Sequence, residues 1–365
     1  MSTHQLRLLL GLGLAGLASP ARAQTAFRGL EALFTTPRAY VVQHTTAAIT
    51  IDGDLREPAW QQAPWTAEFV DIEGAAKPQP SLRTQAKLLW NDSTLFVAAT
   101  LQEPQLWATQ MQHDDIIFKD HDFEVFIDPT NNTHQYFELE INARNQTFDL
   151  FLPKPYRNGG DALVSWDAPG LRSAVQLRGT LNQPQDTDQG WIVEMAIPLR
   201  SLRIGYPFRA PAEGTLWRLN FSRVEWDLDT RNGQITKQQD AAGHNRPEHN
   251  WVWSPQGVID MHYPERWGYL QFTRQPGTTF RLPYAELQRQ YLWLVYYRQQ
   301  RYRAQHGRYA PSLAALGIAP QVELEHLANQ LVLHAQPTQF SITIAAAGHP
   351  TLRLNDEGLV STPKP

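Results

Sequence analysis

Acidic and amide side chains recur at every second position in two apolar stretches of the chain, and together they could form a polar binding surface. In the stretch 122–128, Phe123, Val125 and Ile127 would share one face of a strand, with Glu124 on the other. The stretch 136–142 alternates in the same way. If these two strands and one at 216–226 are neighbours, one sheet face carries Glu124, Glu140, Asn142, Asn220 and Ser222. These groups donate and accept hydrogen bonds, which suits a neutral polyol such as a sugar.

The two glutamates of this face also allow a hydrolytic alternative. Retaining glycosidases use two carboxyl groups about 5 Å apart, a separation that Glu124 and Glu140 would reach on adjacent strands. Such pairs are also common on solvated sheet faces, and nothing in the sequence marks one of them as an acid with a raised pKa. A nucleophile elbow, a phosphate-binding loop, a dinucleotide fingerprint and a zinc-protease motif are all missing from the sequence. We therefore predict no catalytic residue and rank an enzyme behind a binding protein.

A sugar site also needs an aromatic wall for the C–H face of the ring, and tryptophan provides one. The chain has 12 tryptophans, of which Trp107, Trp251 and Trp253 are the candidates for such a wall. Trp251 and Trp253 are two residues apart and would project to the same side of an extended strand. The alternative for each of the three is a place in the core, where most large apolar side chains lie.

Oxygen ligands in and around the stretch 122–128 could bind a structural calcium ion. The candidate ligands are Asp120, Asp122 and Asp128, and the alternative is a plain polar turn. The sequence has no cysteine, which excludes disulfides, thiolate zinc and iron–sulfur clusters. Haem bound by a methionine and a histidine is a further alternative, with the pairs Met111 and His113 or Met261 and His262. We expect no cofactor apart from calcium.

The charge balance and the first residues indicate an exported protein that does not bind nucleic acid. Lysine and arginine total 32 against 36 acidic residues, so the net charge is −4 and offers no attraction for nucleic acid or an anionic membrane. Residues 8–18 are an apolar run too short to span a bilayer, and Ala21-Arg22-Ala23 fits a signal-peptide cleavage site. We predict a bacterial, periplasmic or secreted protein, cleaved near Ala23 and not inserted in a membrane.

Short strands separated by turns dominate the middle of the sequence and predict an all-β sandwich or barrel, of which we expect the sandwich. The expected strands lie at 48–52, 85–90, 95–101, 123–128, 135–142, 191–197, 216–226 and 267–272. Beyond residue 276, apolar residues at helical spacing predict a helix over 284–305, with Gly307 as its cap. The predicted organisation is a signal peptide (1–23), a tether (24–44), the sandwich (45–274) and a C-terminal helix with a small hairpin (275–365).

Several short segments in a fixed order resemble the family 9 carbohydrate-binding modules over roughly residues 45–273. They are Ile51-Asp52-Gly53 with Trp60, Leu95 to Ala98, Asp122 to Asp128, Phe137 to Asn142, Gly190 to Pro198 and Tyr263 to Gly268. The resemblance implies a β-sandwich that binds sugar without chemistry, between two tryptophans and beside a glutamate, an arginine and amides. It also implies structural calcium. Glu124 falls on the glutamate position, whereas Lys119 and Met261 replace the tryptophans, Glu140 the arginine and Ser222 a glutamine.

The prediction is therefore noncovalent carbohydrate binding by an exported sandwich, in support of polysaccharide breakdown by other proteins. The expected partner is a poly- or oligosaccharide. The first alternative is a structural or protein-contact sandwich that has lost the sugar site, and the second is a glycoside hydrolase.

Overall fold

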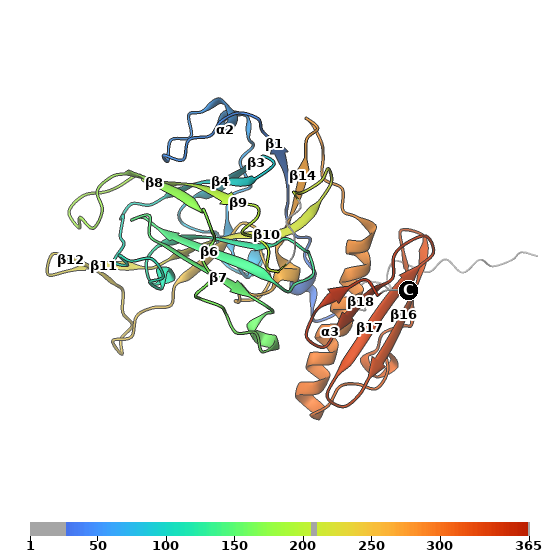
Figure 1. Cartoon of the computed structure of the whole chain (residues 1–365). Helices are drawn as coiled ribbons and strands as arrows, with labels where there is room; N and C mark the ends of the chain where they lie inside the picture. Colours follow the sequence, from blue (N-terminus) through green and yellow to red (C-terminus); the bar gives the residue numbers. More distant parts are fainter. Residues whose placement is uncertain (1–26, 206–209, 364–365) are drawn as a thin grey trace, which may run out of the picture.

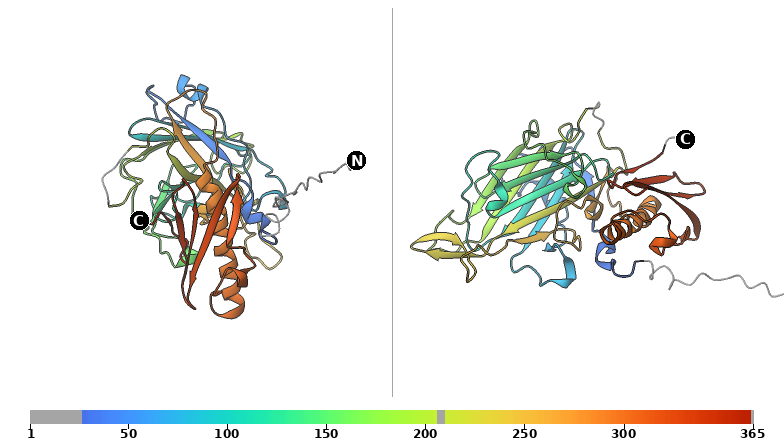
Figure 2. Two further views of the ribbon diagram at one scale, coloured as in Figure 1. Left: turned by 90° about the vertical axis from the view of Figure 1, so that its right-hand side faces the viewer. Right: turned by 90° about the horizontal axis from the view of Figure 1, so that it is seen from below.

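The structure is a computed structural model that describes residues 27–205 and 210–363, and these form two units (Figure 1). A β-sandwich is followed by a C-terminal unit made of a long helix and five strands. Figure 2 shows the two units side by side, with the C-terminal strands and helix at one end of the sandwich. The predicted signal peptide, residues 1–23, lies outside the described residues. None of the helices within 27–205 and 210–363 has the length and apolar character required to cross a membrane.

Twelve strands of the described residues form the continuous sheet of the sandwich. They are β1 (Ala39–His44), β2 (Val70–Asp71), β3 (Thr84–Trp90), β4 (Thr94–Gln102), β5 (Asp122–Asp128), β6 (Tyr136–Asn142), β7 (Thr147–Leu152), β8 (Arg172–Arg178), β9 (Gly190–Pro198), β10 (Leu216–Glu225), β13 (His249–Val252) and β14 (Gly268–Thr273). The main path runs in the order β7-β6-β5-β10-β14-β1-β3-β4-β9-β8, and β13 with β2 pairs alongside β10. A separate hairpin consists of β11 (Leu228–Arg231) and β12 (Gln234–Lys237).

The two halves of this path, β7 to β14 and β1 to β8, face each other across a single large core. Phe123, Val125 and Ile127 of β5 are all buried in it, as their alternation predicts. The predicted all-β fold is therefore present, and the predicted strands lie within a few residues of the observed ones, except for the run at 48–52, which is not a strand. The structure also has strands that were not predicted, among them β1, β7 and β8.

The predicted N-terminal tether must be corrected, because part of it forms regular structure. Of the predicted tether 24–44, residues 31–34 form the short 3-10 helix η1 (Glu31–Phe34) and residues 39–44 form β1. β1 pairs in parallel with both β14 and β3, so it joins the two halves of the sheet. Tyr40 and Val42 of β1 are buried, since the strand is covered on its inner face by the core. The segment is short and its side chains do not alternate cleanly between polar and apolar, which hides the strand in the sequence.

Glu194 of β9 binds two segments of the chain that each lie more than 130 residues before it in the sequence. Its Oε1 accepts the indole N–H of Trp60 at 2.7 Å, and its Oε2 accepts the backbone N–H groups of Asp52 and Gly53 at 3.0 Å each. Trp60 lies in the short helix α2 (Pro58–Gln62) and is fully buried. Gly53 has φ of +82°, a region that favours glycine, and its backbone passes close to Gln176. The Asp-Gly turn and the tryptophan are thus fixed to the sheet by one carboxylate.

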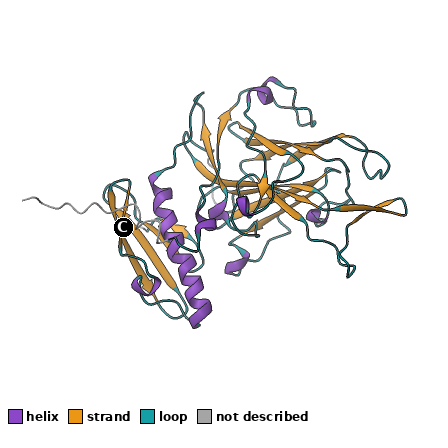
Figure 3. Cartoon of the chain, turned by 180° about the vertical axis from the view of Figure 1, so that it is seen from behind, coloured by secondary structure: helices purple, strands orange, loops and turns teal. Residues whose placement is uncertain are grey.

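The C-terminal unit is an α-helix packed on an antiparallel sheet. The helix α3 (Tyr284–His306) ends at Gly307, whose φ of +69° and N–H bond to the carbonyl of Arg303 match the predicted cap. Figure 3 shows α3 lying along the strands, and its buried side chains share a second core with β17 and β18. The predicted small hairpin is instead a five-stranded sheet with the strands β15 (Gln321–Leu324), β16 (Leu327–Ala335), β17 (Phe340–Ala346), β18 (Leu352–Asn355) and β19 (Val360–Ser361).

Buried ion pairs and hydrogen bonds connect the two units. Glu286, in the first turn of α3, accepts from Arg218 of β10 at 2.8 Å, from the amide of Asn131 at 2.9 Å and from the Tyr269 hydroxyl at 3.2 Å. The side chain of Glu286 is only 3% exposed. The C-terminal unit is therefore docked on the sandwich through a desolvated polar contact rather than through an open linker.

Candidate functional site

The outer face of β5, β6 and β7 borders a cavity of about 460 Å³. This volume lies in the range of small-ligand sites. The cavity is lined by strand residues and by loops that rise above them, namely Ile72, Ile116, Phe118, Glu124, Phe126, Glu138, Glu140, Phe148, Leu150, Tyr156, Val164, Val224, Pro247, Glu248, Asn250, Ile259, Asp260, Met261 and His262. The predicted polar face of the sheet is therefore a concave surface with walls.

Three glutamates form the floor of this cavity. Glu124 of β5 pairs directly with Glu140 of β6 in the antiparallel ladder, and Glu138 lies one step further along the same face. The carboxyl oxygens of Asp122, Glu124 and Glu140 approach within 4.8 Å of one another. Glu140 Oε2 accepts the backbone N–H of Phe118 at 3.0 Å, whereas one carboxyl oxygen each of Glu124 and Glu138 has no protein partner. A buried polar atom without a partner is costly, so these oxygens are suited to bind a ligand group.

Burial keeps protons on this acidic floor at neutral pH. It raises the pKa of Glu124 to about 7, and burial together with the charge of Glu124 raises the pKa of Glu138 to about 8. Burial and the neighbouring carboxylates also hold the pKa values of Glu140 and Asp122 well above their usual range. Because protonated and ionised carboxyl groups are both present near pH 7, the floor can donate as well as accept hydrogen bonds.

Exposed apolar side chains surround the acidic floor. Five of them line the cavity and are between 40% (Ile116) and 67% (Ile259) exposed, the other three being Phe118, Tyr156 and Val164. The ring of Tyr156 makes an edge contact with His262, with 4.5 Å between the ring centroids. Burial, with the charge of Arg157, lowers the pKa of His262 to about 4, so this imidazole is neutral at pH 7. An apolar rim over hydrogen-bonding groups fits an amphipathic ligand such as a sugar ring.

Of the predicted polar site residues, the structure brings Glu124 and Glu140 together in the cavity. Ser222 pairs with Glu124 across the ladder, and its buried hydroxyl has no hydrogen-bond partner. Asn142 is buried and occupied, because its amide donates to Gln110 and Asp120 and its oxygen accepts two backbone N–H groups. Asn220 is likewise bonded to the backbone of Ser254 through both its amide and its oxygen. The two asparagines therefore hold loops in place and do not face a ligand.

The predicted tryptophan wall is wrong. Trp107, Trp251 and Trp253 are 7%, 5% and 1% exposed, and none of them borders the cavity. Trp251 and Trp253 do project to the same side, as their spacing predicts, but that side is the sandwich core. Alternation identifies which side chains share a face, yet it does not say which face is open, because in a sandwich the inner face collects the large apolar groups.

The predicted calcium ligands lie apart and serve different structural roles. Asp120 accepts hydrogen bonds from three donors, the N–H and hydroxyl of Thr109 and the N–H of Gln110, and Asp128 accepts the N–H groups of Thr130 and Thr133 in the turn after β5. Asp122 points to the acidic floor and accepts the N–H of Val224. These three aspartates do not converge on one point. Calcium binding by them stays a prediction.

Several cavity residues were not predicted as site residues. Glu138 shares its face with Glu140 at a two-residue spacing, which is a signal that the sequence contains. Met261 and Phe118 line the cavity at and next to the positions where the resemblance implies tryptophans. Tyr156, Ile259 and His262 come from loops, whose path in space no periodicity indicates.

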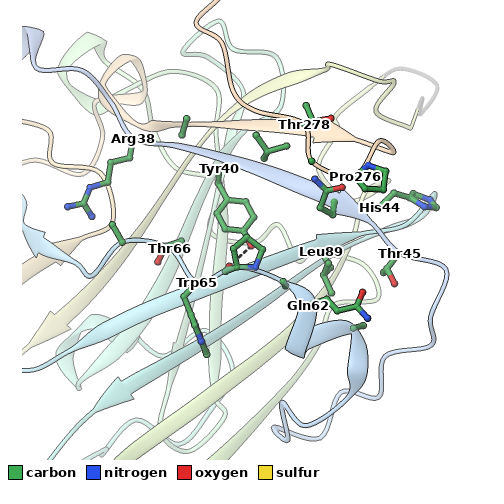
Figure 4. A pocket seen from close by; sticks show the side chains of 18 of the residues that line it. Arg38, Tyr40, His44, Thr45, Gln62, Trp65, Thr66, Leu89, Pro276 and Thr278 are labelled. Atoms are coloured by element: carbon green, nitrogen blue, oxygen red, sulfur yellow. Dashed lines mark hydrogen bonds between the residues drawn. The ribbon is translucent and has the colours of Figure 1, made fainter.

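A larger groove of about 710 Å³ lies between β1 and the segment after α2 (Figure 4). Two of its polar groups are already bound, since the Tyr40 hydroxyl donates to the carbonyl of Pro64 and the Arg38 guanidinium donates to that of Glu68, both at 2.7 Å. Trp65 beside it is 39% exposed, but the ammonium of Lys87 lies 4.3 Å from the ring centroid and covers one face. The groove has one buried nitrogen without a hydrogen-bond partner, His44 Nε2, whereas the smaller cavity has two such carboxyl oxygens beside exposed apolar side chains and is the better candidate despite its lower volume.

Comparison with known proteins gives one match to a family and a few distant relatives. A curated extracellular protein of Arthroderma benhamiae is 26% identical over 183 residues, which are 47% of this chain and 77% of that protein. A solved candidate carbohydrate-binding protein of Bacteroides uniformis is 13% identical, with a TM-score of 0.48 over 65% of this chain and 100% of that one. A family 9 carbohydrate-binding module of Caldicellulosiruptor kristjanssonii, solved with cellotriose, is 16% identical, with a TM-score of 0.39 over 67% of this chain and 99% of that one.

The family assignment depends on none of these three proteins. The model of the family described as "Carbohydrate family 9 binding domain-like" matches residues 51–268, which include the acidic floor and most of the loops around the cavity. Because this match spans more than half of the 365 residues, the chain belongs to the carbohydrate family 9 binding domain-like family.

Proposed function

We propose that the cavity over β5, β6 and β7 binds a carbohydrate without covalent chemistry. The observation that carries the proposal is the juxtaposition of unpartnered carboxyl oxygens on the floor with exposed apolar side chains on the rim. Hydroxyl groups of a sugar can pair with Glu124, Glu138 and Glu140, while the C–H face of the ring lies against Tyr156. The family to which the chain belongs supports the same reading.

The charge of the cavity restricts which sugars fit. Its lining includes five carboxyl groups, those of Glu124, Glu138, Glu140, Glu248 and Asp260, and no lysine or arginine. A uronic acid would add a further negative charge to this surface and is disfavoured. Neutral sugars and amino sugars carry hydroxyl or ammonium donors, which match the acceptors on the floor.

Hydrolysis is less compatible with this arrangement. A retaining glycosidase needs one ionised nucleophile and one protonated acid, so the environments of its two carboxyl groups must differ. Here burial raises the pKa of both Glu124 and Glu140, so neither carboxyl group is held fully ionised as a nucleophile at pH 7. We therefore propose binding, with hydrolysis of polysaccharide as the alternative that an assay for released reducing ends would detect.

Isothermal titration of the purified chain with glucose, cellotriose, glucosamine and galacturonate tests the proposal. The first two are the ligands named for the Caldicellulosiruptor module. At least one neutral or amino sugar should bind, and galacturonate should not. Glu124→Gln should weaken binding about tenfold or more, which corresponds to about 1.4 kcal/mol.

Two matched variants separate this cavity from the other groove. Tyr156→Phe should bind normally, whereas Tyr156→Ala should bind about 3- to 10-fold more weakly, because only the ring is needed for stacking. Trp65→Ala alters the larger groove and should leave affinity unchanged. If Glu124→Gln binds as well as the unaltered chain, or if Trp65→Ala abolishes binding, the cavity is not the site. Absence of binding to any sugar would favour a sandwich that acts through protein contacts.

We also propose that the protein is exported and supports the breakdown of polysaccharides by other proteins. The apolar run and small-residue site before Gln24 motivate this proposal. Mass spectrometry of the protein recovered from its natural host should find an N-terminus near Gln24. An intact first residue would contradict cleavage.

A further inference from the structure

Four side chains from three separate segments converge beside the edge strand β7. His113 and Asp114 come from the loop before the short helix η3 (Ile117–Lys119), Asp149 from β7 and Asp167 from the loop that follows. One potential ligand atom of each residue lies within 4.8 Å of all the others. His113 Nε2 is 2.8 Å from Asp167, 3.4 Å from Asp114 and 3.8 Å from Asp149.

The orientation of the imidazole is fixed by its other nitrogen. His113 Nδ1 lies 3.0 Å from the backbone carbonyl oxygen of Thr147, which can only accept a hydrogen bond. Nδ1 therefore carries the hydrogen, and Nε2 is left to face the carboxylates. A histidine that ligates a metal commonly donates its second N–H in this way, and the bond orients the ring. Nε2 can then either carry a second hydrogen, which it would donate to Asp167 at 2.8 Å, or offer its lone pair to a cation placed between the four groups.

Asp149 provides an independent indication of a ligand. Its side chain is only 2% exposed, and its Oδ2 accepts the backbone N–H of Ala168. Its Oδ1 is buried, has no hydrogen-bond partner among the described residues and faces His113. A buried carboxylate oxygen without a donor is costly, and a bound cation would remove that cost.

We propose that His113, Asp114, Asp149 and Asp167 bind one divalent transition-series cation, with zinc as the representative. Imidazole nitrogen together with carboxylate oxygen is a ligand set for zinc or manganese, whereas calcium takes oxygen ligands. This site is separate from the proposed sugar cavity. It does not include the calcium ligands predicted from the sequence, Asp120, Asp122 and Asp128.

A second cluster, which unlike the first is buried throughout, shows how a set with an internal counter-charge differs. Glu103, His121 and Glu225 also lie within metal-binding distance of one another. There, Arg223 donates to Glu103 and to Glu225 at 2.8 Å each, so the protein itself supplies the positive charge. No arginine or lysine bonds to the carboxylates around His113 in the described residues.

The cation would brace two loops that shape the cavity. Ile116 and Phe118 follow His113 closely, Val164 precedes Asp167, and all three line the cavity. Linking these loops to β7 through one ion would restrict their opening, since the loops otherwise contact the strand through a few hydrogen bonds.

Titration calorimetry of the full chain, stripped with a chelator, with zinc chloride and separately with calcium chloride tests the site. One zinc ion should bind with an affinity at least tenfold higher than calcium. His113→Ala and the more exposed Asp167→Asn should each lower zinc affinity at least tenfold. His244→Ala is the matched control, because His244 is an exposed histidine paired with Asp240 alone, and it should bind zinc normally.

Hydrogen exchange provides a second readout. Zinc should slow exchange in 112–118 and 163–168 of the unaltered chain but not of His113→Ala. Equal zinc affinity in the unaltered chain and both variants, or loss of zinc binding in His244→Ala, would overturn the proposal. Calcium binding at this site as tight as zinc binding would overturn the assignment to a transition-series cation.

Discussion

The buried carboxyl groups of Glu124 and Glu138 should make the stability of the protein decrease as pH rises. Their folded pKa values are about 7 and about 8, raised by burial from the usual 4.5. Between these limits the folded state keeps protons that the unfolded chain has released, so the free energy of unfolding falls with increasing pH. Calorimetry should show Tm falling by several degrees from pH 5 to pH 8, since each kcal/mol shifts Tm by roughly 2–4 °C in a domain of this size.

A substitution on the floor isolates this effect. Glu138→Gln cannot ionise and should flatten the pH dependence, whereas Glu68→Gln, in an exposed pair with Arg83, should not. A Tm that stays constant or rises over this range in the unaltered chain would contradict the assignment. So would an equally steep dependence in Glu138→Gln.

Glu194 should be among the most sensitive single positions for stability. Its carboxylate accepts three N–H groups, from Trp60, Asp52 and Gly53. Glu194→Ala leaves these donors without a partner and should lower the free energy of unfolding by about 3 kcal/mol or more, while Trp60→Phe removes one bond and a small amount of apolar area, for about 1–2 kcal/mol. Urea denaturation measures both, and a cost below ~1 kcal/mol for Glu194→Ala would show that the carboxylate is dispensable.

At the scale of elements, strands with strict alternation could be predicted from the sequence and irregular ones could not. The faces of β5 and β6 follow directly from the period of two, which is why Glu124 and Glu140 were found. The openness of a face depends on which loops rise over it, and the loop residues Tyr156 and Ile259 carry no such pattern. The prediction that Trp251 and Trp253 form a ligand wall was wrong for a related reason. Alternation predicts that the two side chains share one side of the strand, but not whether that side is exposed.

The docking of α3 on the sandwich should depend on Glu286. Removing its carboxylate leaves Arg218, itself buried, without its ionic partner, and breaking a buried pair in this way costs about 3–5 kcal/mol. Glu286→Ala should therefore expose the segment 275–283 to limited proteolysis and lower Tm. Glu323→Ala, on the exposed strand β15, is the control and should behave as the unaltered chain. Equal resistance to protease in both variants would show that the apolar contacts of α3 suffice.

At the scale of the whole molecule, two separate cores share one polar boundary. The sandwich core contains most of the buried tryptophans, whereas α3 contributes Tyr291, Tyr296 and Tyr297 to the second core. The helix α3 lies where the spacing of apolar residues after residue 276 predicts it. The five-stranded sheet was predicted only in part: Phe340, Ile342 and Ile344 alternate as in a strand, whereas β15 and β19, with four and two residues, are too short to show a period.

The place of β1 between β14 and β3 has a practical consequence for anyone who shortens this chain. Residues 39–44 and 268–273 begin and end the sandwich in sequence, yet they are adjacent partners in the sheet. A fragment cut at the limits of the family match, 51–268, loses β1 entirely and nearly all of β14. In such a fragment the edges of β3 and β10 that normally pair with β1 and β14 would be unpaired, so it should aggregate on expression. A fragment of residues 27–363 keeps both strands and should elute as a single species on size exclusion. The limits of the family match therefore lie inside the sheet and are not suitable ends for a fragment.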